Sequence, residues 1–314
     1  MAHYLVTGGA GFIGSNIVHE LARRGERVRV LDDFSTGRRE NLEGAEADFE
    51  LVEGSITDFE TCRGACEGID FVLHQAALPS VPRSIIDPVS STHVNVGGTV
   101  NLLHAAVKAG VKRFVFAASS SAYGNTPTLP KHEEMPANPM SPYAVTKLTG
   151  EQFCKAFFYC YGLETVALRY FNIYGPRQDP YSQYGAVIPI FCRQIIRGQP
   201  APIHGDGRQT RDFTFVADAV EANLLACSAP PTCAGEVINI GASGRTSVLE
   251  LFEMLRDLLG RPDAQAEFLE PRAGDVRDSY ASIDKAKRLI GYEPRYDIRR
   301  GLELAIDYYK RVCG

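Results

Sequence analysis

TGGAGFIG, at residues 7–14, is the stretch that decides the fold. It follows a short apolar run at residues 4–6 and leads into a segment whose apolar residues have helical spacing. Gly8, Gly11 and Gly14 form the pattern Gly-x-x-Gly-x-x-Gly, which combines a tight turn, close approach of the backbone to a pyrophosphate, and close packing of helix on strand. Free N–H groups at the helix N-terminus favour phosphates. The stretch therefore predicts a strand–turn–helix unit that binds a dinucleotide.

The second predicted strand favours this interpretation over a plain strand–helix turn. The strand Val28–Leu31 ends at Asp32 and Asp33, where a carboxylate can accept hydrogen bonds from an adenosine ribose. Because a carboxylate there would repel a 2′-phosphate, NAD is favoured over NADP. Arg38 and Arg39 follow closely and leave NADP as the alternative.

Apolar runs and helical stretches alternate through the first half of the chain. The predicted strands are Tyr4–Thr7, Val28–Leu31, Phe49–Val52, Phe71–His74, Phe114–Ala118 and Thr165–Leu168. The predicted helices are Ile13–Arg24, Val94–Ala109 and Tyr143–Tyr161. Such alternation, with β-branched residues in the strands, is typical of a parallel sheet with helices on both faces. We therefore predict an α/β fold with a Rossmann-type doubly wound parallel sheet.

The sequence changes in character after Asn172, where glycine, proline, arginine and aromatic residues crowd together. A strand at Glu236–Ile240 resembles the earlier strands and is expected to return to the same sheet. Further helices are predicted at Val187–Arg197, Ala217–Cys227, Val248–Leu259 and Ile298–Val312. The expected domains are a dinucleotide-binding domain at residues 1–171 plus about 235–243, and a smaller, interleaved α/β substrate domain at residues 172–234 and 244–314.

The composition argues against several classes of protein. The chain has 314 residues, 45% hydrophobic and 23% charged, as in an ordinary soluble protein of one large or two unequal domains. A net charge of −5 argues against a nucleic-acid partner. The sequence has no apolar run of 18 residues, so no membrane span is predicted. Eight cysteines without a Cys-x-x-Cys pair favour reduced thiols over a zinc site. With no signal peptide recognisable, we expect a cytoplasmic protein without a bound metal.

The segment SPYAVTK, at residues 141–147, places Tyr143 and Lys147 at positions i and i+4 on one helix face. A free tyrosine has a pKa of about 10, too high for a base at neutral pH. A neighbouring ammonium group and a nicotinamide cation would favour the phenolate and lower that pKa. The pair therefore predicts a general acid/base with its tuning cation. An amphipathic tyrosine beside a solvated lysine is the structural alternative.

A cluster of serines follows the predicted strand at residues 114–118. Ser119, Ser120 and Ser121 lie where that strand ends, and ligands of doubly wound sheets bind at the carboxyl ends of the strands. A hydroxyl there can share a hydrogen bond with a substrate alcohol. A serine-rich turn that only caps the strand is the structural alternative.

These motifs occur in the order found in a known family. The glycine turn, the serines before Tyr123-Gly124 and the Tyr143/Lys147 pair together resemble an extended short-chain dehydrogenase/reductase. The likeness covers nearly the whole chain. It continues in the stretches RYFNIYGPR (169–177), GAVIP (185–189), RDF (211–213) and RAGD (272–275). Within this family the sequence is most similar to UDP-hexose 4-epimerases, especially those acting on N-acetylhexosamines.

The resemblance implies a role for each matching residue. Tyr143 is the implied catalytic acid/base, Lys147 tunes it and anchors a ribose, and Ser119 or Ser120 is the catalytic serine. The implied cofactor-binding residues are Gly8, Gly11, Phe12, Ile13, Gly14, Asp32, Asp33, Ser35, Gly37, Ser55, Ile56, Ala76, Ala77, Asn95, Tyr143 and Lys147. The implied substrate-binding residues are Ser119, Ser121, Tyr143, Asn172, Val187, Arg211, Arg272, Asp275 and Ser279.

Three of these positions carry a specific expectation. Family members often have Gly-Asp after the third strand, with the aspartate on the adenine amine; here Ser55 takes that place, so weaker cofactor binding is expected. Arg211 and Arg272 suit a diphosphate through bidentate, charge-assisted hydrogen bonds. Ser279 matches the family position beside C2 of the sugar, where a small residue admits an N-acetyl group.

The implied reaction is NAD-dependent epimerisation at C4 of a UDP-hexose through a 4-keto intermediate. The expected substrates are UDP-N-acetylglucosamine/UDP-N-acetylgalactosamine and also UDP-glucose/UDP-galactose. The resemblance further implies a homodimer formed through the helices near residues 94–109 and 143–161. Polysaccharide biosynthesis is one pathway that such an enzyme serves.

Other functions remain open at this stage. A UDP-glucuronate 4-epimerase shares the same motifs. A nucleotide-sugar 4,6-dehydratase or decarboxylase usually has an acidic residue after its catalytic Ser or Thr, whereas residues 119–121 here are all serine. A non-catalytic NAD-sensing protein commonly loses the tyrosine or the lysine, and this chain has both. Neither the preferred sugar nor the catalytic serine among residues 119–121 follows from the sequence.

Overall fold

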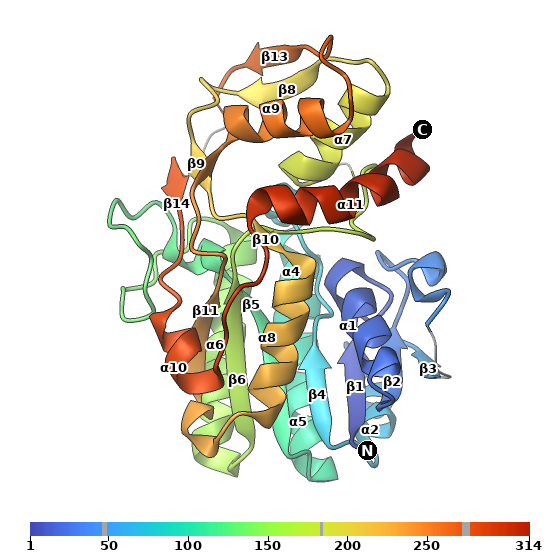
Figure 1. Cartoon of the computed structure of the whole chain (residues 1–314). Coiled ribbons are helices and arrows are strands. Elements are labelled where there is room, and N and C mark those ends of the chain that lie inside the picture. The colour runs from blue at the N-terminus through green and yellow to red at the C-terminus, as the bar shows by residue number, and fades with distance from the viewer. Residues whose placement is uncertain (46–48, 183–184, 272–276) are drawn as a thin grey trace.

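A seven-stranded parallel sheet forms the larger part of the molecule (Figure 1) in the computed structural model, which describes residues 1–45, 49–182, 185–271 and 277–314. Across the sheet the strand order is β11-β6-β5-β4-β1-β2-β3, and every neighbouring pair is parallel. The strands are β1 His3–Thr7, β2 Arg27–Asp32, β3 Glu50–Glu53, β4 Phe71–His74, β5 Arg113–Ser119, β6 Glu164–Tyr170 and β11 Glu236–Ile240. The predicted α/β doubly wound sheet is confirmed.

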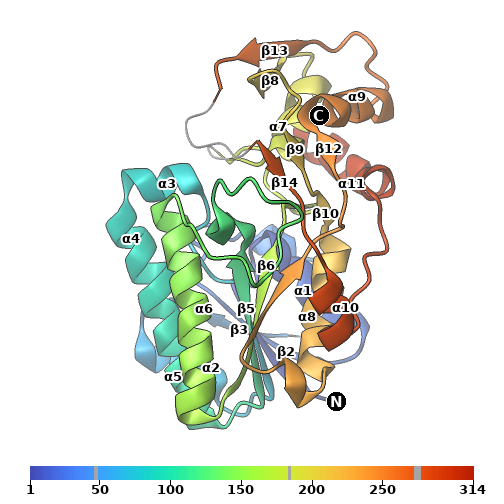
Figure 2. The same ribbon diagram turned by 90° about the vertical axis from the view of Figure 1, so that its left-hand side faces the viewer.

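Helices cover both faces of this sheet (Figure 2). On one face lie α1 (Phe12–Arg23) and α8 (Val216–Ser228); on the other lie α2 (Phe59–Cys66), α5 (Thr99–Ala109) and α6 (Pro142–Tyr161). Successive side chains of a strand point to opposite faces, so neighbouring residues enter different cores. In β1, Val6 packs in the core beneath α1 and α8, and Leu5 in the core beneath α2, α5 and α6.

A smaller part of the molecule lies over the carboxyl ends of the sheet strands (Figure 1). Its helices are α7 (Val187–Ile196), α9 (Val248–Leu258) and α11 (Ile298–Cys313). Its short strands are β7 (Ile173–Tyr174) with β10 (Thr214–Phe215), β8 (Ala201–His204) with β13 (Ala266–Leu269), and β9 (Thr210–Arg211) between β12 (Thr246–Ser247) and β14 (Asp278–Ser279). The predicted residue boundaries of two interleaved domains stay a prediction.

The helix predicted at Val94–Ala109 has a different start. Two short helices precede it, α3 (Val81–Ile86) and α4 (Pro88–Thr92), and a π-helical turn at His93–Gly98 joins α4 to α5. Proline stands in the first turn of both short helices, where its missing N–H costs no hydrogen bond. α2 and α10 (Asp284–Ile290) are further helices that the sequence pattern did not predict.

The strand predicted at Glu236–Ile240 is part of the large sheet. Glu236–Ile240 returns to the sheet and pairs with β6 in parallel, from Glu236 opposite Val166 to Ile240 opposite Tyr170. None of the helices in the described ranges combines the length and hydropathy needed to cross a bilayer. In the same ranges, no cluster of three or more His, Cys, Asp or Glu side chains has the arrangement of a metal site.

Candidate active site

The glycine turn between β1 and α1 leaves no room for side chains. Gly8 has a φ of +65°, and a Cβ there would lie 2.7 Å from the backbone nitrogen of Ala76. A Cβ on Gly14 would lie 2.1 Å from the carbonyl oxygen of Gly8. Gly11 precedes α1 without a capping side chain, so the first N–H groups of the helix are open to a ligand. The turn therefore has the close backbone contacts that a dinucleotide site requires.

Asp32, at the end of β2, faces the glycine turn. Its carboxylate is 7% exposed and accepts hydrogen bonds from the backbone N–H of Ala10 (2.9 Å) and of Phe34 (2.8 Å). Burial raises the pKa of Asp32, against the lowering effect of these two bonds. A Cβ on Gly37 would lie 2.8 Å from the carboxylate, so the following loop folds tightly against it. Asp32 is thus placed between the turn and the loop, where an adenosine ribose is expected.

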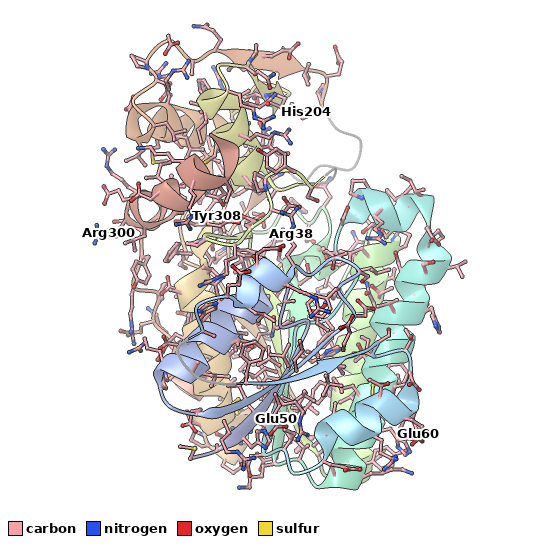
Figure 3. All side chains as sticks on the ribbon, turned by 90° about the vertical axis from the view of Figure 1, so that its right-hand side faces the viewer. Arg38, Glu50, Glu60, His204, Arg300 and Tyr308 are labelled. Carbon is pink, nitrogen blue, oxygen red and sulfur yellow. The ribbon has the colours of Figure 1, made fainter. Side chains whose placement is uncertain are left out.

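The other residues of this loop form contacts within the protein. Asp33 accepts from the backbone N–H (3.0 Å) and hydroxyl (2.6 Å) of exposed Ser35. Arg38 forms an ion pair of 2.8 Å with Asp179, at the junction of the two parts of the molecule (Figure 3). The neighbouring Arg39 pairs with Glu53 and stacks over Phe34. Both arginines are therefore engaged with carboxylates, which favours NAD over NADP at Asp32.

Asn95 connects the loop after β4 to α6. Its side-chain oxygen accepts from the N–H of Leu78 (2.7 Å), and its amide nitrogen donates to Leu78 O and to Thr146 Oγ1 (3.2 Å each). Asn95 lies in the π-helical turn, a feature frequent at functional sites. These hydrogen bonds attach α6 to the loop at Thr146, the residue that precedes Lys147.

The remaining predicted cofactor residues surround the same edge of the sheet. Ser55 accepts hydrogen bonds from the N–H (3.3 Å) and hydroxyl (3.0 Å) of Thr57. Ile56 is buried, and its side chain packs against Gly98 in the turn that carries Asn95. Ala76 and Ala77 follow β4, and Phe12 and Ile13 open α1.

Tyr143 and Lys147 lie in the first two turns of α6. Lys147 is 5% exposed, and its ammonium donates to the carbonyl of Ala117 at 2.8 Å. The ammonium nitrogen lies 6.0 Å from the centre of the Tyr143 ring. Burial lowers the pKa of Lys147 to about 8. The start of the helix is held by Ser84, whose hydroxyl accepts from the backbone N–H of Tyr143 at 3.0 Å. The predicted pair thus shares one helix face.

Ser119 is the serine that reaches Tyr143. Burial raises the pKa of Tyr143, and a side-chain hydrogen bond with Ser119 acts in the opposite direction. The Ser119 oxygen also accepts from the N–H (3.2 Å) and the hydroxyl (2.9 Å) of Ser121. Ser120, also predicted as a candidate, begins a 3₁₀ helix and makes no side-chain hydrogen bond to the described residues. The geometry therefore favours Ser119 among the three.

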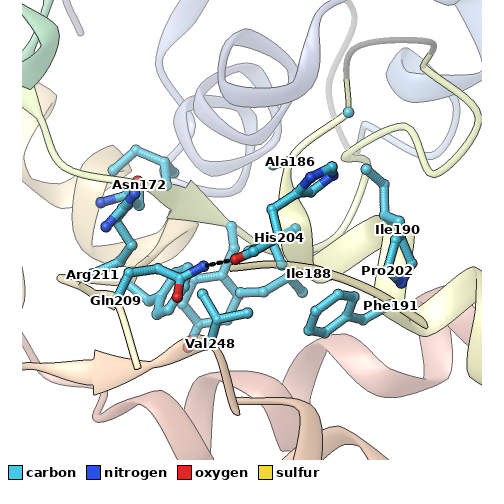
Figure 4. Close-up of a pocket in the computed structure, with 15 residues that line it drawn as sticks. Asn172, Ala186, Ile188, Ile190, Phe191, Pro202, His204, Gln209, Arg211 and Val248 are labelled. Carbon is cyan, nitrogen blue, oxygen red and sulfur yellow. Dashed lines mark hydrogen bonds between the residues drawn. The ribbon is translucent and has the colours of Figure 1, made fainter. Parts of the chain in front are cut away.

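A cavity of about 240 Å³ lies between α7 and the short strands of the smaller part. Its lining residues are Asn172, Ile173, Tyr174, Gly185, Ala186, Val187, Ile188, Ile190, Phe191, Pro202, His204, Gln209, Arg211, Phe213 and Val248. Figure 4 shows Asn172 and Arg211 on one side and Ile190, Phe191 and Pro202 on the other. Apolar walls with a few polar groups are typical of a site for a small-molecule ligand.

Three predicted substrate residues, Asn172, Val187 and Arg211, line this cavity. Ser279 is paired in register with Arg211, because β14 runs parallel to β9. Arg272 and Asp275 lie outside the described residues. Ser119 is paired with Tyr170, two residues before Asn172, so the serine and the cavity meet at the carboxyl ends of β5 and β6.

A model of the NAD dependent epimerase/dehydratase family matches residues 4–241. The chain belongs to this family. The UDP-glucose 4-epimerase of Mycolicibacterium smegmatis is 39% identical over 310 residues, 98% of either chain. A Thermotoga maritima UDP-glucose 4-epimerase structure with UDP-glucose has 38% identity and a TM-score of 0.93, covering 99% of this chain and 100% of that one. A Methanobrevibacter ruminantium UDP-N-acetylglucosamine 4-epimerase structure, with UDP-N-acetylmuramic acid, has 35% identity and a TM-score of 0.93, covering 98% of both chains.

Membership of the epimerase/dehydratase family confirms the predicted resemblance, the NAD cofactor and an epimerase-type enzyme. The glycine turn and Asp32 fit NAD on their own geometry, as described above. Relatives at 34% and 32% identity carry the names UDP-glucuronate 4-epimerase and UDP-N-acetyl-alpha-D-glucosaminuronate decarboxylase, so the family alone does not specify the sugar.

Two residues of the cavity, His204 and Gln209, gave no signal in the sequence, whereas Phe213 belongs to the RDF stretch singled out there. His204, Gln209 and Phe213 reach the cavity from separate short strands and loops, and Gln209 donates to the carbonyl of His204 at 2.7 Å (Figure 4). His74, at the end of β4, hydrogen-bonds with its Nδ1 to the Thr7 hydroxyl at 2.7 Å and with its Nε2 to Thr99 Oγ1 at 2.9 Å. Burial lowers the pKa of His74 to about 3, so the ring is neutral.

Proposed function

We propose that this chain epimerises C4 of a UDP-hexose with NAD. The proposed substrates are UDP-N-acetylglucosamine/UDP-N-acetylgalactosamine and UDP-glucose/UDP-galactose. The observation that carries the proposal is the grouping of Ser119, Tyr143 and Lys147 at the carboxyl ends of the strands, between the glycine turn and the cavity that holds Arg211. Ligands of open α/β sheets bind at this edge.

Each of the three side chains has a role that its contacts support. The Tyr143 Oη takes the proton of the C4 hydroxyl, and the Ser119 hydroxyl shares a hydrogen bond with it. The Lys147 ammonium lies 6.0 Å from the Tyr143 ring and favours the phenolate electrostatically. NAD supplies the hydride acceptor and, in reverse, the hydride donor for C4. Because the hydride returns to the sugar, the overall reaction is redox-neutral.

The cavity supports the second requirement of an epimerase, which is that the sugar turns over while the nucleotide stays bound. Val187 and Phe213 line the cavity and would pack against a uracil ring, and Arg211 offers a guanidinium to the diphosphate. Anchoring the UDP group in this way keeps the oxidised sugar near Tyr143 through its rotation.

The competing reactions need groups that this site lacks in its described part. A dehydratase or decarboxylase needs a carboxylate beside the catalytic serine, and residues 119–121 supply three hydroxyls. UDP-glucuronate is the alternative substrate that the relatives' names support. The test is to incubate the protein with acetylated, plain and uronic UDP-hexoses and to analyse the sugar nucleotides by chromatography and NMR. Elimination or loss of carbon dioxide without any C4 epimer would contradict the proposal.

The acetylated substrates are proposed because of Ser279. Ser279 is paired in register with Arg211, and Arg211 lines the cavity that we propose to hold the UDP group. A serine there leaves room for an acetamido group, and its hydroxyl can form a hydrogen bond with the amide.

We further propose that the enzyme is a homodimer. Val81, Ile85, Ile86, Val89 and Val145 are large apolar residues exposed on α3, α4 and α6, with Ile86 at 72% and Val89 at 77%. Exposed apolar surface concentrated on adjacent helices is typical of an interface. The predicted helix at residues 94–109 contributes less, because the apolar side chains of α5 are largely buried.

The test of the dimer is sedimentation of Ile86→Glu, with Val89→Glu as a second variant. Dissociation to monomers is expected in both, because a carboxylate in the interface would lose its hydration. A monomeric wild-type protein would contradict the homodimer.

We propose a cytoplasmic location and a place in polysaccharide biosynthesis, to which epimerised UDP-sugars are supplied. The eight cysteines are free thiols, seven of them buried, as expected in a reducing compartment. Deleting the gene and measuring surface polysaccharide composition would test the pathway, and an unchanged content of the epimerised sugar would contradict it.

A further inference from the structure

A buried ion pair lies behind Lys147 and takes no part in the reaction proposed above. Glu151 follows Lys147 by one helical turn on α6 and is 1% exposed. Arg169, on β6, is 5% exposed and binds Glu151 through two parallel hydrogen bonds, Nε to Oε1 at 2.8 Å and Nη2 to Oε2 at 2.7 Å. Breaking such a pair is costly, but replacing it with apolar residues is often neutral or stabilising. Stability alone therefore does not explain why these charges are buried here.

The Arg169 side chain also contacts the segment that follows the catalytic serine. The Arg169 guanidinium stacks over the ring of Tyr123 at 4.6 Å, and Tyr123 ends the short helix that begins after Ser119. The Arg169 Nη1 is buried without a hydrogen-bond partner in the described part of the chain. The guanidinium is thus held mainly by Glu151 and Tyr123.

Glu151 acts on Lys147 through space. The ammonium donates to Ala117 O, and Glu151 directs its two oxygens at Arg169. Burial lowers the pKa of Lys147, and the charge of Glu151 raises it again. Burial also raises the pKa of Glu151, and Arg169 opposes this effect. The two hydrogen bonds from Arg169 favour the ionised form of Glu151, and the charge of Glu151 in turn favours the charged form of Lys147.

The other groups around the ammonium do not replace Glu151. On β4, His74 is neutral at neutral pH. On α6, burial holds the pKa of the Cys154 thiol well above its ordinary value. Tyr143, one turn earlier, is the group to be tuned. On β5, Phe116 presents the face of its ring at 5.1 Å. Glu151 is therefore the anionic side chain that acts on Lys147 at neutral pH.

We propose that the Glu151–Arg169 pair is a positioning element that keeps Lys147 charged at the place where the fold buries it. The inference rests on the proposed function only for its effect on turnover. Glu151 and Arg169 are positioning residues, because they act through Lys147.

The test replaces both charges together, as Glu151→Met/Arg169→Met, since removing one partner would leave the other charge buried. The matched control is Arg113→Met/Glu164→Met. Arg113 is 4% exposed and pairs with Glu164. These two residues begin β5 and β6, so the pair lies at the amino ends of the strands, away from Ser119.

The first readout needs no turnover. A lysine whose pKa is lower in the folded than in the unfolded chain opposes folding below its folded pKa, and this effect disappears as the pH rises towards the unfolded value. The urea midpoint of each chain is compared with that of its Lys147→Met derivative from pH 5 to pH 10. In the wild type and the control, the urea midpoint relative to that of the Lys147→Met derivative should begin to rise near pH 8. In the Glu151→Met/Arg169→Met chain this Lys147-dependent rise should begin at least one pH unit lower.

The second readout is the pH profile of kcat for epimerisation. Its alkaline limb should move down by at least one pH unit in the Glu151→Met/Arg169→Met enzyme, and turnover at pH 8, near the wild-type pKa of Lys147, should fall by about fivefold or more. The control pair should keep the wild-type limb. If the Lys147-dependent rise starts at the same pH in all backgrounds, the inference is wrong. If that rise shifts but no epimerisation is seen in any chain, the inference stands and the proposed function fails.

Discussion

Ser119→Ala removes the hydroxyl whose side-chain hydrogen bond lowers the pKa of Tyr143, and we expect this variant to shift the pH range of the proposed reaction. Burial raises the pKa of Tyr143, and the Ser119 bond lowers it. A hydrogen bond to a charged group contributes roughly 1.5–3 kcal/mol. Without this bond the phenolate should need a higher pH to form, and since about 1.36 kcal/mol corresponds to a factor of ten, about 10–100-fold less phenolate should be present at a given pH.

The consequence for turnover follows from the fraction of phenolate. Below the Tyr143 pKa, the amount of base falls tenfold for each unit by which the pH lies under that pKa. Ser119→Ala should therefore lower kcat by about 10–100-fold on the acid limb, with a smaller loss at the alkaline end. The assay is the pH profile of kcat from pH 5.5 to pH 9.5 with a saturating UDP-hexose.

Two neighbouring serines provide the controls. Ser120→Ala should keep the wild-type profile, because Ser120 makes no side-chain hydrogen bond to the described residues. Ser121→Ala should have an intermediate effect, because its hydroxyl donates to Ser119 at 2.9 Å. An unshifted acid limb in Ser119→Ala, or an equal shift in Ser120→Ala, would refute the assignment of Ser119.

Three further predictions concern the base, the cofactor and the sugar. Tyr143→Phe should lose about 10²–10⁴-fold in turnover while it stays folded and keeps NAD, and wild-type turnover would exclude Tyr143 as the base. The nucleotide released from denatured wild-type protein should be NAD, since Asp32 is buried beside the glycine turn; chromatography that finds NADP would move attention to Arg38. Ser279→Tyr should lower kcat/KM for the acetylated pair by about tenfold or more relative to the plain pair, because overpacking costs about 1–3 kcal/mol. An unchanged ratio would place Ser279 outside the sugar pocket.

The sheet could be predicted from the sequence because its signals are local. Strands such as Phe71–His74 and Arg113–Ser119 contain short apolar runs, and the turn at residues 7–14 has glycines at the places where the backbone packs closest. The return of Glu236–Ile240 was predictable for the same reason, since its β-branched residues resemble those of the earlier strands, and it pairs with β6 at one edge of the sheet. The same local signals did not predict α3 and α4, each of which has proline in its first turn, or the π-helical turn before α5.

In the candidate site, too, some contacts follow from local spacing in the sequence and others depend on the tertiary fold. Tyr143 and Lys147 are four residues apart on one helix, so their proximity follows from helix geometry alone. Arg169 is 18 positions from Glu151, and their pairing depends on β6 lying directly behind α6. No periodicity in the sequence encodes that distance. The lysine was therefore recognisable as a tuning cation from its spacing, but the charge that keeps it ionised became visible only once the strands were in place.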